Sequence, residues 1–131
     1  MKLLVIEDSD SIRRMIEALV STRGHKVVAV SSGVKGLEAA FADPPDAVLL
    51  DLHMPGTYDG FDVCERLRAD EKTRTIPIIV ISAMSDNESK QRALEKGATA
   101  FYTKPFSPTA LLKELESLRG RAATPPPTTA T

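Results

Sequence analysis

Four polar sites in this chain could together bind a divalent cation and handle a phosphoryl group. They are the adjacent acids Glu7 and Asp8, then Asp51, Ser82 and Lys104. Carboxylate oxygens suit magnesium, which takes few protein carboxylates and completes an octahedral shell with water and phosphate oxygens. An aspartate carboxylate can also attack phosphorus to form an acyl phosphate, while fixed cations stabilise the charge on the phosphoryl oxygens.

Each of these residues also has an ordinary structural explanation. The acidic pair could cap a helix, Ser82 could simply end a strand, and Lys104 could be a surface charge. Asp51 is the strongest candidate, because a carboxylate at the end of a buried strand is costly unless a cation or hydrogen-bond donors compensate it. Pro105 restricts Lys104 to an extended backbone, which helps to aim its ammonium along the edge of a sheet.

The candidate residues stand at the ends of short apolar runs, or directly after them. These runs are rich in Val, Ile and Leu on consecutive positions, which indicates strands that are covered on both faces, as in a parallel sheet. The predicted strands are residues 2–6, 26–30, 46–50, 77–82 and 99–103.

Amphipathic segments follow each predicted strand. Gly24 is expected to end the first helix, Ser85 with Glu88 has the pattern of a capping box for the fourth, and Ser107 with Pro108 is typical of a helix start. The apolar stripes are Ile12, Met15, Ile16, Leu19 and Val20, then Val34, Leu37 and Phe41, then Phe61, Cys64 and Leu67, and last Leu111, Leu112, Leu115 and Leu118. The fourth helix, residues 85–96, is the most polar and is predicted to be weakly buried, with little beyond Ala93 and Leu94 to bury.

Five repeats of strand then helix predict an α/β fold, a five-stranded doubly wound parallel sheet with five helices on its two faces. In such folds ligands bind beyond the carboxyl ends of the strands. The 131 residues, 42% hydrophobic and 27% charged, suit one compact domain over residues 1–119. Residues 120–131 are rich in Pro, Thr and Ala and are predicted to be a flexible tail or the stub of a linker.

Composition argues against several classes of partner. The net charge is -1 and acids and bases are mixed along the chain, so there is no basic footprint for nucleic acid or an anionic membrane. No apolar run approaches the roughly 20 residues that span a bilayer. The single cysteine, Cys64, excludes an intrachain disulfide and a cysteine-rich zinc site, and we interpret it as a core residue. We therefore expect a cytoplasmic protein.

Four segments, in order, resemble the receiver domain of two-component response regulators. They are residues 4–8 (Leu-Val-Ile-Glu-Asp), 48–56 (Val-Leu-Leu-Asp-Leu-His-Met-Pro-Gly), 81–83 (Ile-Ser-Ala) and 104–106 (Lys-Pro-Phe). The resemblance spans residues 2 to about 119 and implies a CheY-like, flavodoxin-like three-layer sandwich.

The resemblance implies a role for each candidate. Asp51 would be the phosphoacceptor, Lys104 would bind the phosphoryl group, and Ser82 would be the switch hydroxyl. Magnesium, or manganese in its place, would be held by Glu7, Asp8, Asp51 and the backbone carbonyl of His53. The small side chain of Ala83 would leave room for the phosphoryl group, and Phe101 would be the switching aromatic.

Three features depart from the family pattern. Gly60 follows Asp51 by nine residues instead of eight, so the loop that carries Thr57 and Tyr58 is one residue longer. Phe101 lacks the hydroxyl that a switching tyrosine would have. The position two beyond Asp51 is His53, which we interpret as an exposed side chain on a ligand carbonyl rather than a catalytic base.

The resulting prediction is a magnesium-dependent phosphoacceptor switch. It would take its phosphoryl group from a sensor histidine kinase or a histidine phosphotransfer protein and signal to a downstream protein by contact, with no nucleic acid or membrane as partner. It would be a monomer or a phosphorylation-dependent dimer, and not an enzyme beyond its own phosphorylation and dephosphorylation.

Three alternative functions agree less well with these residues. A receiver-like scaffold that works without phosphorylation would not need the retained Asp51 and Lys104. A phosphohydrolase of the haloacid dehalogenase type needs a second acid where His53 stands. A flavodoxin-like electron carrier needs a Ser/Thr-rich loop where residues 7–11 read Glu-Asp-Ser-Asp-Ser.

Overall fold

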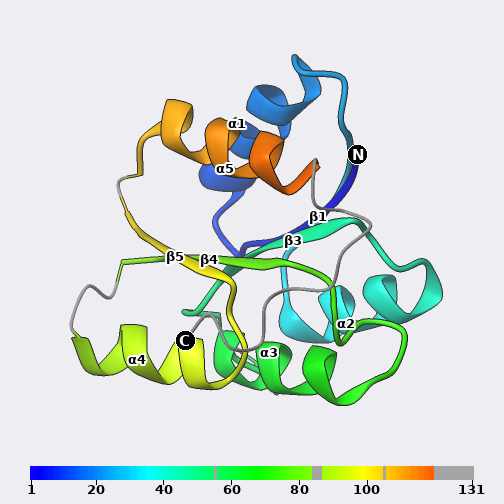
Figure 1. Cartoon of the computed structure of the whole chain (residues 1–131), viewed down its shortest axis with the longest axis vertical. Helices are drawn as coiled ribbons and strands as arrows, with labels where there is room; N and C mark the ends of the chain where they lie inside the picture. The colour runs from blue at the N-terminus through cyan, green and yellow to red at the C-terminus, as the bar shows by residue number, and fades with distance from the viewer. Residues whose placement is uncertain (55, 84–86, 105, 120–131) are drawn as a thin grey trace.

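One parallel sheet organises the molecule. The computed structural model describes residues 1–54, 56–83, 87–104 and 106–119, with the backbone alone for residues 118 and 119 (Figure 1). Within these residues the sheet has the strand order β2-β1-β3-β4-β5. The strands are β1 (Lys2–Ile6), β2 (Lys26–Val30), β3 (Ala47–Asp51), β4 (Ile78–Ser82) and β5 (Ala100–Thr103).

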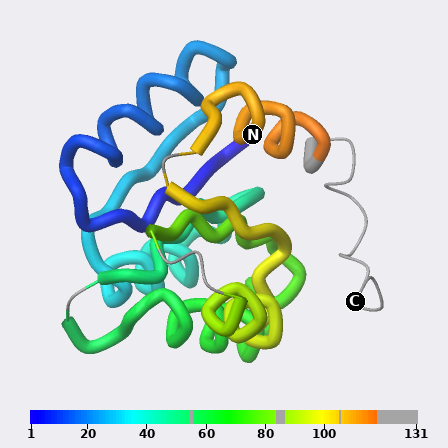
Figure 2. Tube along the Cα trace, turned by 90° about the vertical axis from the view of Figure 1, so that its left-hand side faces the viewer, coloured from blue at the N-terminus to red at the C-terminus, as the bar shows by residue number. Residues whose placement is uncertain are grey.

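A helix follows each strand, as the alternation of patterns predicted. The helices are α1 (Asp10–Ser21), α2 (Gly33–Ala42), α3 (Gly60–Ala69), α4 (Asn87–Glu95) and α5 (Pro108–Arg119). Helices α1 and α5 cover one face of the sheet, and α2, α3 and α4 cover the other (Figures 1 and 2). The predicted five-stranded doubly wound sheet with five helices is confirmed.

Alternate residues of the central strands supply two separate cores. Leu3 and Val5 of β1 pack in the cluster under α1 and α5, whereas Leu4 and Ile6 pack in the cluster under the other three helices. Cys64 is buried in the second cluster, as expected for a core residue. Because both faces of β1, β3 and β4 are buried, these strands are apolar at consecutive positions.

Two expectations about burial were wrong. Strand β2 lies at the edge of the sheet, so Lys26 is exposed and Val28 is 48% exposed, although the apolar run predicted burial on both faces. Met15 is exposed as well, because α1 is fixed to the sheet mainly through the buried Ile16 and Val20. The exposure of β2 follows from the order of the strands, and the exposure of Met15 follows from the rotation of α1 about its axis. An apolar pattern alone predicts neither.

Short sequence signals set the helix ends. The Ser9 hydroxyl accepts a backbone hydrogen bond as the N-cap of α1, and the Ser107 hydroxyl accepts one at the start of α5. Gly24 has a φ of 80° just beyond α1, a conformation that glycine adopts without strain. The predicted cap at Ser85 lies outside the described residues, as does the predicted tail, so both stay predictions.

Candidate functional site

The ends of four neighbouring strands bring the predicted residues to one edge of the sheet. Glu7 directly follows β1, Asp51 and Ser82 are the last residues of β3 and β4, and Lys104 directly follows β5. In the parallel register Ile6 is opposite Leu50, Asp51 is opposite Ile81, and Ser82 is opposite Thr103. The predicted constellation is therefore formed by the topology itself.

Three carboxylates lie close enough to bind one cation. One oxygen each of Glu7, Asp8 and Asp51 can be chosen so that all three lie within 4.8 Å of one another. Glu7 is 2% exposed and Asp51 is 3% exposed, whereas Asp8 is open to solvent. A set of oxygen ligands with one solvent-facing member fits magnesium, which retains several water ligands. Ser9, not the acidic pair, caps α1, so capping does not explain these acids.

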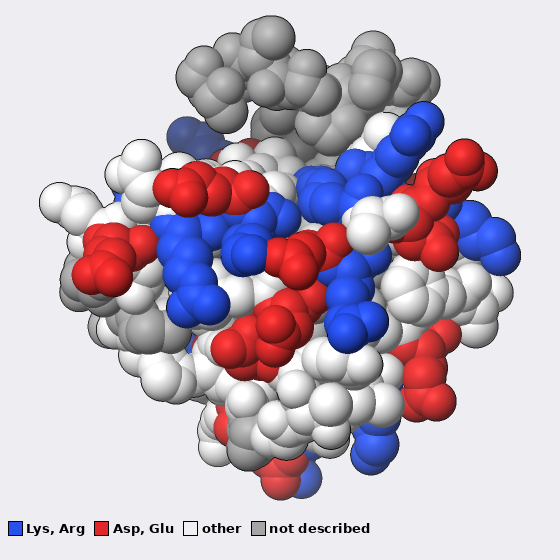
Figure 3. Space-filling view, turned by 90° about the horizontal axis from the view of Figure 1, so that it is seen from below, with Lys and Arg blue, Asp and Glu red and all other residues white. Residues whose placement is uncertain are grey.

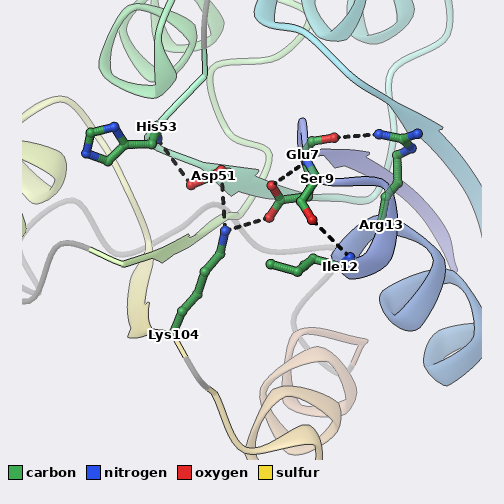
Figure 4. A network of polar contacts seen from close by, with 7 residues as sticks. All are labelled: Glu7, Ser9, Ile12, Arg13, Asp51, His53 and Lys104. Atoms are coloured by element: carbon green, nitrogen blue, oxygen red, sulfur yellow. Dashed lines mark hydrogen bonds and ion pairs between the residues drawn. The ribbon is translucent and has the colours of Figure 1, made fainter.

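The ammonium of Lys104 lies between two of the carboxylates (Figure 4). Its Nζ is 2.9 Å from Oε1 of Glu7 and 3.4 Å from Oδ2 of Asp51. Burial alone would lower the pKa of Lys104, but the hydrogen bonds and charges of Glu7 and Asp51 outweigh it and raise that pKa. A fixed positive charge therefore lies beside the Asp51 carboxylate.

Burial makes both buried acids harder to ionise. It raises the pKa of Glu7 to about 7, against the opposing hydrogen bond from Lys104. Burial also raises the pKa of Asp51, which the hydrogen bonds with Glu7 and His53 and the charge of Lys104 counteract only in part. A divalent cation would favour the ionised form of both groups, because opposite charge lowers the pKa of a carboxyl group.

The loop after β3 orients the Asp51 carboxylate. The backbone N–H of His53 donates to Oδ1 of Asp51 at 3.1 Å, and the buried side chains of Leu52 and Met54 anchor the loop on either side. The imidazole of His53 is exposed and points away from Asp51 (Figure 4). This placement agrees with an exposed side chain rather than a base, and the ligand role of its carbonyl stays a prediction.

Comparisons with known proteins decide the family. Residues 3–116 match the family described as the response regulator receiver domain. The chain belongs to the response regulator receiver family. It is 33% identical over 120 residues to the DNA-binding dual master transcriptional regulator RpaA of Synechocystis, covering 92% of this chain and 49% of that protein.

Two solved receiver structures share the fold. The chemotaxis protein CheY4 of Vibrio cholerae has a TM-score of 0.83 at 31% identity, over 89% of this chain and 97% of that one. The receiver domain of the sensor histidine kinase PA1611 from Pseudomonas aeruginosa has a TM-score of 0.84 at 28% identity, over 91% of this chain and 97% of that one. The latter structure is described with a magnesium ion coordinated in the active site cleft.

The chain matches only part of each of these longer regulators. The chain spans 26% to 50% of the length of the curated relatives it matches. Because RpaA is named as DNA-binding, the expectation that no nucleic acid is involved has no support for a whole protein of this family. Within the described part of the chain no helix is long and apolar enough to cross a membrane.

The longer loop of this receiver folds against α2 and α3. Gly60 approaches the strand end so closely that a Cβ there would lie 2.4 Å from Cα of Leu52. Tyr58 packs over the start of α2, where a Cβ on Gly33 would lie 2.6 Å from the Tyr58 carbonyl oxygen. The Arg66 guanidinium lies 4.2 Å from the centre of the Tyr58 ring. The loop therefore contributes Tyr58 to the surface over the start of α2 and beside Arg66 of α3.

The receiver's predicted switch residues occupy β4, β5 and the turn after β4. Ser82 is fully buried, and its carbonyl accepts a hydrogen bond of 2.7 Å from the Lys104 backbone N–H. Ala83 is exposed directly after it. Phe101 is half-buried, packs on the side of α2, α3 and α4, and lies opposite Val80 in the sheet. Their switching roles stay predictions.

Two residues near the acids were not predicted as part of the site. The backbone N–H of Ser9 donates to Oε2 of Glu7 at 3.1 Å, and Nη1 of Arg13 donates to the Glu7 carbonyl at 2.9 Å (Figure 4). In the sequence, the only indication of these contacts is that Ser9 and Arg13 lie two and six residues after Glu7. That spacing predicts contact only when α1 is known to start at Asp10.

Proposed function

We propose that this receiver is a phosphoacceptor switch in which Asp51 takes a phosphoryl group in a magnesium-dependent reaction. The supporting observation is the buried Asp51 carboxylate, which has the Lys104 ammonium at 3.4 Å and two further acids within reach of the same cation. It is a signalling protein that catalyses only its own phosphorylation and dephosphorylation.

The transfer needs an oriented nucleophile and charge compensation. A bond forms between an oxygen of Asp51 and phosphorus, the bond from phosphorus to the donor's histidine nitrogen breaks, and its electron pair returns to that nitrogen. The His53 N–H and the Lys104 ammonium hold the two oxygens of Asp51, on Oδ1 and Oδ2 respectively. Lys104 is then positioned to stabilise the charge of the phosphoryl oxygens.

Glu7, Asp8 and Asp51, with the carbonyl of His53, would hold the Mg²⁺ ion, and Mn²⁺ is expected to substitute. When bound, the ion neutralises the repulsion between the anionic carboxylate and the anionic phosphoryl group. Ser82 would then donate to a phosphoryl oxygen beside the small Ala83, and the change would reach the surface through Phe101.

The partners follow from this chemistry. The donor is a sensor histidine kinase or a histidine phosphotransfer protein in the cytoplasm, and the output is contact with a downstream protein, as a monomer or a phosphorylation-dependent dimer. Membership of the receiver family supports the phosphohistidine donor. For this chain we propose no direct contact with nucleic acid. A longer protein of this family can bind DNA, as the name of RpaA states.

Incubation with acetyl phosphate and Mg²⁺, followed by intact mass measurement, tests the proposal. The wild-type chain is expected to gain one phosphoryl group and Asp51→Asn none. Asp43→Asn is the matched control, because it removes the same charge from an exposed residue at the opposite edge of the sheet. No addition to the wild type would favour the phosphorylation-independent scaffold, and equal addition to wild type and Asp51→Asn would exclude Asp51 as the acceptor.

A further inference from the structure

Arg13 reaches back from the first turn of α1 to the acidic site. Its Nη1 donates to the Glu7 carbonyl at 2.9 Å (Figure 4). Its Nη2 forms an ion pair with Asp10. Its side chain is only 19% exposed, although it carries a full charge. A guanidinium held in this way has both its position and its orientation defined.

The contacted carbonyl lies where the chain leaves the sheet. The Glu7 N–H still donates to the Val30 carbonyl at 3.1 Å, in continuation of the pairing of β1 with β2. Two residues later, the Ser9 carbonyl already accepts a hydrogen bond of 2.9 Å from the Arg13 N–H within α1. The Glu7 carbonyl lies between the hydrogen bonds of the sheet and those of α1. The Arg13 side chain supplies the donor for this carbonyl.

The position of the Asp8 carboxylate depends on the turn that leads from β1 into α1. The Asp8 side chain is exposed and makes no hydrogen bond or ion pair with another described residue. The Glu7 side chain, by contrast, is held by Ser9 and Lys104. A contact that fixes the Glu7 carbonyl fixes the peptide plane between Glu7 and Asp8, because that unit is rigid. The Cα atom of Asp8 belongs to that unit, so the contact from Arg13 restricts where the Asp8 side chain begins.

We propose that Arg13 is a positioning residue for the divalent cation, acting through the Glu7 carbonyl; this inference rests on the cation site of the proposed function. A direct electrostatic effect of Arg13 would have the opposite sign, since a nearby positive charge repels a cation. The ion pair with Asp10 reduces that repulsion. Positioning therefore predicts that loss of Arg13 weakens cation binding, whereas charge alone predicts that it tightens binding.

Titration calorimetry with Mg²⁺ on the full chain distinguishes the two effects. Arg13→Gln is expected to raise the Kd about tenfold, the lower end of the range for residues that orient metal ligands. Arg14→Gln is the matched control, because the neighbouring arginine is exposed, makes no hydrogen bond or ion pair with the described residues of the acidic site, and loses the same charge. Its Kd is expected to stay within about twofold of wild type or to fall slightly.

Two further measurements separate positioning from general damage. In metal-free protein, the Ser9 amide should exchange faster with solvent in Arg13→Gln, while amides of β3 keep their protection; loss of overall stability would increase exchange in both. Arg13→Lys keeps the charge and one donor, so its Kd should lie between wild type and Arg13→Gln. If Arg13→Gln is unfolded, Arg13→Lys decides: weaker binding than wild type supports the proposal, and equal binding overturns it.

The measurements distinguish a wrong role of Arg13 from a wrong cation site. If wild type binds Mg²⁺ and becomes phosphorylated, but Arg13→Gln binds Mg²⁺ at least as tightly as wild type, only the role of Arg13 is wrong. If the wild-type chain binds no Mg²⁺ at all, the proposed cation site is wrong and the role of Arg13 is overturned with it.

Discussion

At the scale of single residues, the site keeps two acids in surroundings that oppose their ionisation. Glu7 and Asp51 are both buried, and Lys104 is the cation that contacts both of them among the described residues. Such an arrangement costs free energy in the metal-free protein and makes binding of a cation more favourable. Binding of a cation is therefore coupled to the release of a proton.

This coupling predicts a pH dependence of Mg²⁺ binding. Since the pKa of Glu7 is raised to about 7, a proton occupies this ligand below that pH and must leave before the cation binds. The affinity for Mg²⁺ should therefore fall between pH 8 and pH 6, as measured by calorimetry at constant ionic strength. Glu7→Gln should bind more weakly and show a flatter profile. An affinity of the wild type that is constant over this range would contradict the role of Glu7.

The thiol of Cys64 should be chemically silent in the folded protein. Burial raises its pKa to about 12, so the reactive thiolate is scarce at neutral pH. A disulfide reagent is expected to modify the native chain only at the slow rate of unfolding and to react at once after addition of denaturant. Rapid stoichiometric reaction of the native chain would show that the core around Cys64 opens easily.

Polar residues at the carboxyl ends of the predicted strands indicated the site, because a parallel sheet brings these ends together. For this reason the positions of Glu7, Asp51, Ser82 and Lys104 could be predicted without coordinates. Arg13 could not, since its contact with a carbonyl depends on how α1 leaves the turn. The exposed orientation of the His53 side chain likewise depends on the loop after β3.

At the scale of elements, α4 packs against both β5 and α3. Its buried side chain is that of Ala93, whereas Leu94 is exposed. Lys96, directly after α4, pairs with Glu65, and the Arg92 guanidinium lies 4.1 Å from the centre of the Phe61 ring. The polar sequence of this helix predicted weak burial, but the contacts with α3 follow from helix placement and were not predicted.

Arg68 connects α3 to the segments on either side of β4. Its guanidinium donates to the carbonyls of Gly97, Arg74 and Ile76 at 2.9, 2.8 and 2.6 Å. Gly97 has a φ of 107°, and a Cβ there would lie 2.5 Å from Cγ of Arg68, so the close approach requires glycine. The start of β5 is therefore held by a side chain from α3.

We expect Arg68→Ala to lower the free energy of unfolding by about 2 kcal/mol, because several charge-assisted hydrogen bonds are lost. Arg66→Ala is the control on the same helix. Arg66 is exposed and lies on the Tyr58 ring, a contact of at most about 1 kcal/mol. Urea unfolding measures both variants, and equal losses would show that the Arg68 contacts add nothing beyond a surface arginine.

At the scale of the whole molecule, charge is distributed without a dominant sign. On the face formed by α2, α3 and α4, acidic and basic side chains alternate over the described residues (Figure 3). The mixed charges along the sequence predicted this surface. The order of the strands and the exposure of the edge strand β2 were not predicted, because they depend on which strands pair.

Binding of Mg²⁺ should stabilise the whole fold. A ligand that binds only the folded state at a hundredfold excess over its Kd adds about 2.7 kcal/mol to the free energy of unfolding. Thermal unfolding of the wild type should therefore shift upward in Mg²⁺ relative to EDTA. Asp51→Asn should show a much smaller shift, and Asp43→Asn should respond like the wild type. Equal shifts in all three chains would indicate that the cation binds elsewhere.

The central claim is that Asp51 receives a phosphoryl group with the help of Mg²⁺, and chemical trapping tests it most directly. Borohydride reduces an aspartyl phosphate to homoserine, which tandem mass spectrometry locates in the sequence. After treatment with acetyl phosphate and Mg²⁺, homoserine is expected at position 51 alone, and none when EDTA replaces Mg²⁺. Homoserine at another position, or equal labelling with and without Mg²⁺, would contradict the account.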